Sequence, residues 1–273
     1  MRRRTLAPFG RRSVELTDNR AVGAYSVLTC ADRDGPAPRP GQFYMLAACE
    51  RWGGGEGDRP FVPRACSFMR ATADEDGGVR LEFLLEDVGP GTARLCALHA
   101  GERLWLLGPL GVGFAPPPAG HDALLVGGGI GIAPLAGWQD ELRAAGISAR
   151  TLLGFRDASH ATGATLMHDP SVATDDGSQG LHGRVTELLA AERGTHATVF
   201  SCGPPAMLEA VRALCAERGI AAQLALESGM ACGFGACFGC VVPTRAGYLR
   251  LCLDGPVIDA AQLETALVAG AGH

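Results

Sequence analysis

The sequence lacks any uninterrupted apolar stretch long enough to cross a membrane as a helix. Its longest apolar run, Ala123 to Trp138, is broken at Gly127, Gly128, Gly129, Gly131 and Pro134, whereas a membrane helix needs about 20 consecutive apolar residues. A secretory leader is lacking as well, because no apolar segment follows the basic start MRRRTLAPFGRR. We therefore expect no membrane association and a solvated, frayed amino terminus.

A clustered basic face is also lacking, and the net charge of −5 argues against nucleic acid as the main partner. The 273 residues suffice for two domains of ordinary size, and an apolar content of 47% is ample for packed cores. Cysteine, in contrast, is abundant. Ten cysteines without a leader predict a reducing compartment, and so a cytoplasmic location.

The first part of the chain has a β pattern. Six short runs, SVELT, YSVLTC, QFYMLAA, RACSFMR, VRLEFLL and RLWLLG, are separated by turn residues up to about Phe114. Dense short strands of this kind predict a small antiparallel β-barrel over residues 1–116. The glycine-rich insertion ERWGGGEGDRP is interpreted as a surface loop. Three successive prolines, Pro116 to Pro118, then predict a stiff hinge.

From His121 onward, strand-like and helical segments alternate, which predicts a doubly wound parallel-sheet domain over residues 119–226. The expected strands are ALLVGG, RTLLGF, ATVFSCG and AAQLALE, and the expected helices are APLAGWQDELRAAG, RVTELLAAERG and PAMLEAVRALCAERG. Residues 227–273 are expected to form a third, small unit whose tail, AAQLETALVAGAGH, closes as a short helix. The predicted fold class is thus β plus α/β.

Four cysteines near the carboxyl end have the spacing C-x4-C-x2-C-x11-C: Cys232, Cys237, Cys240 and Cys252. This spacing is typical of thiolate ligation of a [2Fe–2S] cluster. Gly233, Gly235 and Gly239 let a short loop curl around such a cluster and direct backbone N–H groups at the sulfurs. The alternative is a structural zinc site, which usually pairs two C-x2-C motifs, whereas this chain has one.

Two glycine-containing turns of the α/β region suit a dinucleotide. VGGGIGIAP follows an expected strand and opens a helix, so its backbone N–H groups are available to a pyrophosphate. SCGP ends a later strand of the same sheet, and ligands of open α/β sheets bind at the carboxyl ends of the strands. A purely packing role for the glycines remains the alternative. The candidate nucleotide-binding residues are Gly128, Gly129, Gly131, Pro134, Cys202, Gly203 and Pro204.

Two motifs of the barrel suit a flavin. In RACSF, Arg64 can pair with a phosphate, while Ser67 on the other face of the strand can reach a flavin ring edge. VGPGTARL adds a glycine turn capped by Thr92 at the start of a helix, which is a second anion site. A surface arginine beside a strand serine is the commoner explanation of such a pattern, so the pair of sites carries more weight than either alone.

The order of RACS, VGPGT, GPLGVGF, VGGGIGIAP, SCGP, LESGMACGFGACFGC and LCLDGPV resembles the electron-transfer subunits of class 1B dihydroorotate dehydrogenases, which belong to the ferredoxin-reductase-like family. The resemblance covers nearly the whole chain. It implies an FAD barrel, an NAD domain and a terminal [2Fe–2S] segment ligated by the four cysteines. It also implies FAD contacts at Arg64, Ala65, Cys66, Ser67, Leu84, Leu85, Glu86, Gly91 and Thr92.

The resemblance further implies a partner, an FMN-containing dihydroorotate dehydrogenase catalytic subunit, in a heterotetramer of two copies of each chain. This chain would then pass electrons from that FMN through the cluster and FAD to NAD+ in pyrimidine biosynthesis. FAD is needed because nicotinamide exchanges a hydride, two electrons at once, whereas the cluster accepts one. Arg-Ala-Cys-Ser departs from the family's commoner Arg-Pro-x-Ser around Ala65 and Cys66.

Two other functions remain open at this stage. One keeps the same modules in a subunit of an NADH-dependent ferredoxin–NADP oxidoreductase or a sulfhydrogenase. The other is a non-enzymatic binding module stabilised by zinc. In the flavoprotein interpretation, Asp157 beyond a strand end favours NADH over NADPH, although the neighbouring Arg156 acts in the opposite direction. Cys202 is the one candidate catalytic residue, facing flavin and nicotinamide, with a buried packing role as the alternative.

Overall fold

The computed structural model describes residues 10–53, 60, 62–74, 77–192 and 196–268, so the start of the chain, for which fraying was predicted, and the centre of the glycine-rich insertion lie outside the described residues. Six antiparallel strands close the predicted barrel in the order β1-β2-β5-β4-β3-β6, with the short helix α1 after β5. Their bounds are β1 Arg12–Val22, β2 Tyr25–Asp32, β3 Phe43–Ala48, β4 Arg64–Ala73, β5 Val79–Glu86, α1 Pro90–Cys96 and β6 Arg103–Leu110. All six strands expected from the sequence are confirmed.

Strand β3 is buried along its whole length because it lies between two cores. Tyr44 and Leu46 point into the barrel, where they pack with Leu16, Phe68 and other core side chains. Phe43 and Met45 point outward and belong to a second core. A strand with one face in water alternates apolar and polar residues, whereas a strand that is covered on both faces is apolar throughout. The all-apolar sequence FYMLAA reflects burial on both faces.

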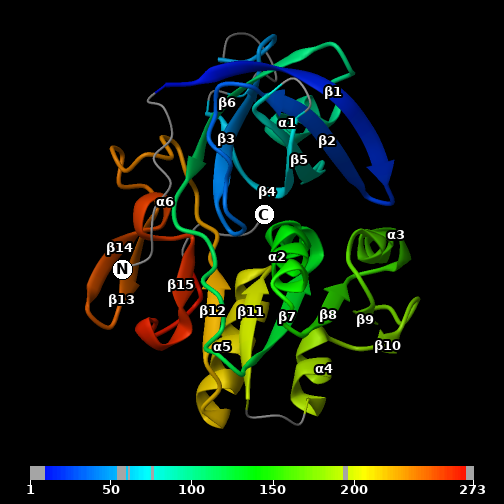
Figure 1. Cartoon of the computed structure of the whole chain (residues 1–273), viewed down its shortest axis with the longest axis vertical. Coiled ribbons are helices and arrows are strands. Elements are labelled where there is room, and N and C mark those ends of the chain that lie inside the picture. Colours follow the sequence, from blue (N-terminus) through cyan, green and yellow to red (C-terminus); the bar gives the residue numbers. More distant parts are fainter. Residues whose placement is uncertain (1–9, 54–59, 61, 75–76, 193–195, 269–273) are drawn as a thin grey trace.

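The second domain contains a seven-stranded sheet in the order β10-β9-β8-β7-β11-β12-β15, and the carboxyl ends of its central strands point at the barrel (Figure 1). All neighbours run parallel except β15, which is antiparallel to β12. The strands are β7 Asp122–Gly128, β8 Ala149–Phe155, β9 Pro170–Thr174, β10 Leu181–His182, β11 Ala197–Cys202, β12 Ala222–Ala225 and β15 Val257–Asp259.

Helices cover both faces of this sheet, as a doubly wound fold requires. Leu125 and Leu153 pack on the side of α2, whereas Leu124 and Leu152 pack on the side of α4 and α5. The helical elements are η1 Gly129–Gly131, α2 Ile132–Ala144, α3 Ala158–Ala161, η2 Thr162–Leu166, α4 Val185–Ala191 and α5 Pro205–Arg218. The sequence predicted α2, α4 and α5; it did not predict α3, η2, β9 and β10, which are too short to show a periodic pattern.

The carboxyl-terminal unit combines a hairpin of β13 (Val241–Thr244) and β14 (Gly247–Arg250) with α6 (Leu251–Asp254). The chain then enters the second domain, because β15 extends its sheet and buries Val257 and Ile258. The predicted closing helix in the tail is wrong: the described tail holds one 3₁₀ turn, η3 (Ala260–Gln262). Its apolar residues Leu263 and Ala266 are buried against the sheet domain rather than arranged along a helix.

The connection between the two domains is fixed at both ends. Val112 N–H donates to the carbonyl of Gly255, and both hydrogen-bonding groups of the Gln223 side chain pair with the backbone of Ala115. The segment leaving the barrel is therefore bound to the carboxyl-terminal unit and to β12. Among the described residues, no helix combines the length and apolarity that a membrane span requires.

Candidate cofactor and electron-transfer sites

The cysteine loop folds over residues 231–240 and brings the four cysteines together in two pairs. The Sγ atoms of Cys240 and Cys252 lie 3.2 Å apart and are buried. In the other pair, the backbone N–H of Cys237 donates to the Sγ of Cys232 across 3.5 Å. A two-iron cluster takes two thiolates on each iron, so paired sulfurs suit it.

Backbone N–H groups of the loop are directed at the Cys232 sulfur. Burial raises the pKa of that thiol, but hydrogen bonds from the backbone of Cys237, Phe234 and Ala236 and from the Cys237 side chain outweigh it and lower the pKa to about 7. At Cys252, burial and the neighbouring Cys240 raise the pKa to about 12. The loop is thus built to stabilise negative charge at its exposed side, as a thiolate-ligated metal site requires.

The cysteine loop also touches the barrel directly. Gly233 has a φ of +76°, and a Cβ there would lie 2.5 Å from Cγ of Met45 and 2.9 Å from Cδ1 of Leu110. Met45 is the cross-strand partner of Ala65 on β4. The loop beside Cys232 therefore rests on the strand adjacent to the predicted flavin strand. The sequence identified Gly233 as a loop former but gave no sign that it faces Met45.

Strand β4 presents the RACS motif as predicted from its alternation. Arg64 and Cys66 share one face and Ala65 and Ser67 the other; Cys66 is buried in the barrel core, and burial raises its pKa to about 12. Any flavin contact of Cys66 must therefore use its backbone. The Arg64 guanidinium covers Gly91, where a Cβ would lie 2.3 Å from its Nε. Arginine and glycine turn thus form one surface suited to phosphate.

The remaining predicted flavin contacts lie next to this surface. The side chains of Leu84 and Leu85 point in opposite directions and are buried in two different cores. Any contact of these residues with a cofactor would therefore be made by their backbone groups. The Thr92 hydroxyl accepts hydrogen bonds from the N–H groups of Val88 and Gly89 and donates to the Gly89 carbonyl. Because that hydroxyl is fully used, Thr92 shapes the turn, and its backbone N–H is the group left to face an anion.

The glycine turn between β7 and α2 divides into packed and open positions. A Cβ on Gly131 would lie 2.4 Å from the Cys202 carbonyl oxygen, and one on Gly128 would lie 2.5 Å from Sδ of Met207. At Gly129, with φ +53°, a Cβ would meet nothing within 4 Å. Pro134 is buried in the first turn of α2. The VGGGIGIAP and SCGP motifs therefore touch, and Gly129 is the position that leaves room for a ligand.

Cys202 ends β11 directly beside this turn, paired with Gly127 of β7. Its side chain is buried, and burial followed by the charge of Glu227 raises its pKa. Glu227 also acts on the pKa of Cys66, which places this carboxyl between barrel and sheet. Desolvation by the surrounding protein raises the pKa of Glu227, although more than a third of the residue's surface stays open to solvent. Glu227 was not among the residues predicted from the sequence, although it follows β12 by two residues at the carboxyl edge of the sheet.

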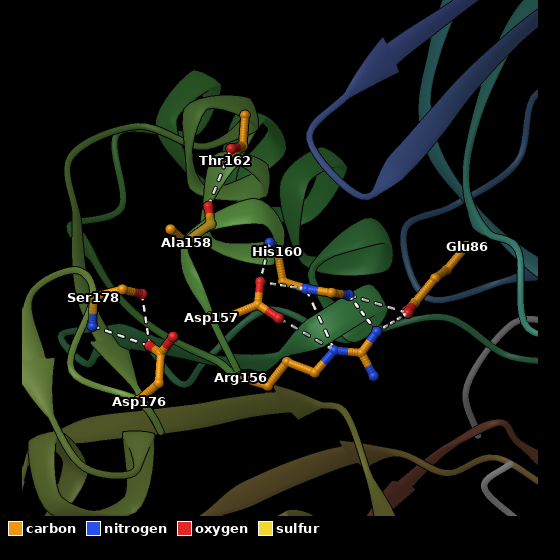
Figure 2. A network of polar contacts seen from close by, with 8 residues as sticks. All are labelled: Glu86, Arg156, Asp157, Ala158, His160, Thr162, Asp176 and Ser178. Carbon is orange, nitrogen blue, oxygen red and sulfur yellow. Dashed lines mark hydrogen bonds and ion pairs between the residues drawn. The ribbon is translucent and has the colours of Figure 1, made fainter.

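Arg156 and Asp157, at the end of β8, belong to a polar network that spans both domains (Figure 2). Asp157 caps α3 by accepting the His160 N–H, and its Oδ1 lies 2.7 Å from the His160 Nδ1. Hydrogen bonds from the His160 side chain and N–H lower the pKa of Asp157. Arg156 donates to Glu86 of the barrel across 2.8 Å. The sequence placed Asp157 and Arg156 correctly at a strand end but did not foresee their link to Glu86.

Comparison with known proteins gives the following relatives. A family model described as the iron-sulfur cluster binding domain of dihydroorotate dehydrogenase B matches residues 227–264. The dihydroorotate dehydrogenase B (NAD(+)) electron transfer subunit of Geobacillus thermodenitrificans is 40% identical over 93% of this chain and 99% of that protein. The subunit of the same name from Bacillus mycoides is 36% identical over 80% of this chain and 84% of that protein.

Solved structures show the same fold. The structure of an NADH-dependent reduced ferredoxin-NADP oxidoreductase matches with a TM-score of 0.76 at 23% identity, over 94% of this chain and 92% of that one. A ferredoxin reductase of carbazole 1,9a-dioxygenase matches with a TM-score of 0.63 at 23% identity, over 77% and 66% of the two chains. The predicted fold class, barrel followed by α/β domain and iron–sulfur segment, is confirmed.

Proposed function

We propose, from the premise that this chain belongs to the family of dihydroorotate dehydrogenase B electron transfer subunits, that it passes electrons from the FMN of a partner catalytic subunit to NAD+. The route runs through a [2Fe–2S] cluster and FAD, and the pathway is pyrimidine biosynthesis. The chain is thus the NAD-linked oxidoreductase subunit of that enzyme, and dihydroorotate is expected to bind the partner chain.

One observation carries the proposal: both other candidate sites pack against the flavin strand or its neighbour. Gly233 of the cysteine loop contacts Met45 on β3, and Met45 pairs with Ala65 on β4. On the other side, a Cβ on Gly137 of α2 would lie 2.7 Å from the Met69 carbonyl on β4. This order supports a flavin between cluster and nicotinamide. Bound FAD supplies the conversion between hydride transfer and single-electron transfer.

The residues divide the work by location. Cys232 and Cys237 are proposed to bind one iron and Cys240 and Cys252 the other. Arg64 and the turn at Gly91 are proposed to hold the FAD phosphates, with Ser67 toward the ring. Because ligation free energy is also folding free energy in a segment this small, the cluster should stabilise the whole carboxyl-terminal unit.

The nicotinamide nucleotide is proposed to lie along the carboxyl ends of β7, β8 and β11. Gly129 gives the pyrophosphate access to backbone N–H groups. Cys202 and Glu227 stand beside this turn, where Cys202 would orient the reacting ring.

The name of the relatives, electron transfer subunit, implies a catalytic partner. We propose that this partner carries FMN and that two copies of each chain assemble. A cytoplasmic location is proposed as well, since none of the ten cysteines is paired in a disulfide, a state that reducing compartments maintain.

The experiment is an anaerobic NADH titration of the protein purified together with its catalytic subunit. The expected spectrum contains flavin and iron–sulfur absorption, and both bands bleach as NADH is added. Cys240→Ser should lose the iron–sulfur band and keep flavin reduction by NADH. A colourless protein that contains zinc, or one whose flavin does not respond to NADH, would refute the proposal.

A further inference from the structure

A carboxylate of the barrel enters the corner of the sheet domain where β8 ends. Glu86 is the last residue of β5, and its Oε1 accepts from Arg156 Nη2 across 2.8 Å and lies 3.2 Å from His160 Nε2. Figure 2 shows Glu86 reaching these two side chains from the opposite domain. The Glu86 side chain is 18% exposed and that of Arg156 is 63% exposed, so the pair is held at one end and open to solvent at the other.

The tip of the β1–β2 hairpin fixes Glu86 in this position. Glu86 is the cross-strand partner of Tyr25, whose ring packs edge-on against His160 with centroids 5.6 Å apart. The neighbouring Ala24 N–H donates to the Ser159 carbonyl, and a Cβ on Gly23 would lie 2.0 Å from that same oxygen. The carboxylate of Glu86 is thus delivered to Arg156 by a tightly seated contact between the domains.

The corner is otherwise acidic. Asp157 follows Arg156 directly, and the N–H groups of Asp175 and Asp176 donate to the carbonyls of Phe155 and Arg156. Asp176 has a lowered pKa, owing to hydrogen bonds from Ser178, and is close enough for its charge to interact with Asp157. The Arg156 guanidinium is therefore paired with two carboxylates, those of Glu86 and Asp157, and Asp176 adds a further negative charge near Asp157.

We propose that Glu86 is a specificity determinant for the nicotinamide nucleotide, because it occupies Arg156, the arginine at the end of β8 that could otherwise bind a 2′-phosphate. This inference rests on the proposed function, in which the adenosine ribose lies at the end of β8. Arginine binds phosphate most strongly when two of its N–H groups donate together, and Glu86 takes the Nη2 group of Arg156. A 2′-phosphate would have to displace Glu86 from Arg156 and leave that carboxylate unpaired beside it, whereas a 2′-hydroxyl requires no such exchange.

The test uses the FAD-loaded protein with its catalytic subunit and compares kcat/KM for NADH and NADPH. Glu86→Gln keeps the shape of the side chain and removes its charge. The expected result is a gain of about tenfold in the ratio of kcat/KM for NADPH to kcat/KM for NADH, equivalent to about 1.4 kcal/mol. Adding Arg156→Ala should abolish the gain, while Arg156→Ala alone should change the NADPH value little, since Glu86 already occupies this arginine.

Glu82→Gln is the matched control. Glu82 lies four residues before Glu86 on β5, so this substitution removes an equal charge away from Arg156 and should leave the nucleotide preference unchanged. If Glu86→Gln lowers both values equally, or leaves their ratio unchanged with FAD retained, Glu86 is only an interdomain contact and the proposal is overturned. A wild-type protein reduced by neither nucleotide would instead refute the proposed function.

Binding of 2′,5′-ADP provides a readout that does not depend on flavin reduction. Competition against ADP, measured by calorimetry, should show tighter 2′,5′-ADP binding in Glu86→Gln than in the wild type. If Glu86→Gln loses FAD, the same binding comparison is made with Glu86→Asp. The shorter side chain of aspartate withdraws the carboxylate from Arg156, so this variant should also bind 2′,5′-ADP more tightly than the wild type. If the ratio of 2′,5′-ADP affinity to ADP affinity is the same in the wild type and in these variants, the proposal is overturned.

Discussion

Gly233→Ala should loosen the contact between the cysteine loop and the barrel. At φ +76° an alanine carries a backbone cost of about 1–2 kcal/mol. Its Cβ would lie 2.5 Å from Cγ and 3.0 Å from Sδ of Met45, and overpacking of this kind costs about 1–3 kcal/mol. The expected total, about 2–5 kcal/mol, is comparable with the whole stability of a small unit. The loop should therefore move away from β3.

Gly235→Ala is the matched control. Gly235 has a φ of +85°, and a Cβ there would lie 2.4 Å from Cδ1 of Leu253, a residue of the cluster unit itself. The two substitutions thus carry similar backbone strain and similar crowding in the same loop. Only the Gly233 change pushes against the barrel. A loss of iron common to both variants reports on loop strain, and a defect confined to Gly233→Ala reports on the contact with Met45.

Stopped-flow absorbance after anaerobic mixing with NADH separates flavin reduction from cluster reduction. Gly233→Ala should keep the rate of flavin reduction and slow the bleaching of the cluster, because electron transfer weakens as the separation grows. Met45→Ala makes room for the new methyl group, so the double variant should recover part of the rate, a coupling expected only of residues in contact. Equal cluster reduction in Gly233→Ala and Gly235→Ala, with equal iron, would refute this reasoning.

Three further predictions concern single side chains. Cys240→Ser should remove the iron–sulfur absorbance and most of the iron, whereas Cys215→Ser, which alters a buried thiol outside the loop, should retain both; full iron in Cys240→Ser would contradict the ligand assignment. Cys202→Ala should slow flavin reduction by NADH roughly tenfold to a hundredfold with FAD retained, as expected when a reacting group is misplaced; an unchanged rate would return Cys202 to a packing role. Hydrogen bonds from Arg212 and from the tail lower the pKa of Glu209 to about 2, so the stability it contributes, about 1.5–3 kcal/mol, is present above about pH 4.5 and is lost as the pH falls toward 2. Urea unfolding at pH 7 and pH 2.5 should show a gap between wild type and Glu209→Gln that closes at the lower pH; a gap independent of pH would exclude an ionic role.

Local patterns in the sequence determined the fold class. Strands such as SVELT and VRLEFLL carry the two-residue period of a half-buried strand, and PAMLEAVRALCAERG carries a helical period with glycine just after its end at Gly219. The spacing of Cys232, Cys237, Cys240 and Cys252 likewise identified the cluster loop, because metal ligands in one loop are constrained by short chain connections. Such signals depend on residues close in sequence, and so they can be read without the structure.

The prediction of a closing helix in the tail was wrong because the structure of the tail depends on residues far away in the sequence. Its apolar residues, Leu263 and Ala266, are buried by the sheet domain, and β15 forms only because β12 offers it an edge. Strand pairing of this kind joins residues more than thirty positions apart, and a three-residue strand has no local signature. Tertiary contacts override weak local preference in such segments.

The relations among the three sites were decided by the tertiary structure alone. The sequence contains Gly233, Met45, Glu86 and Arg156, but nothing in it shows that Gly233 seats on Met45 or that Glu86 occupies Arg156. These contacts join residues separated by 188 and 70 positions in the chain, and they exist because the barrel is docked on the carboxyl ends of the sheet (Figure 1). Residue types and spacing thus determine which cofactors the chain can bind, whereas domain packing determines how those cofactors are placed to exchange electrons.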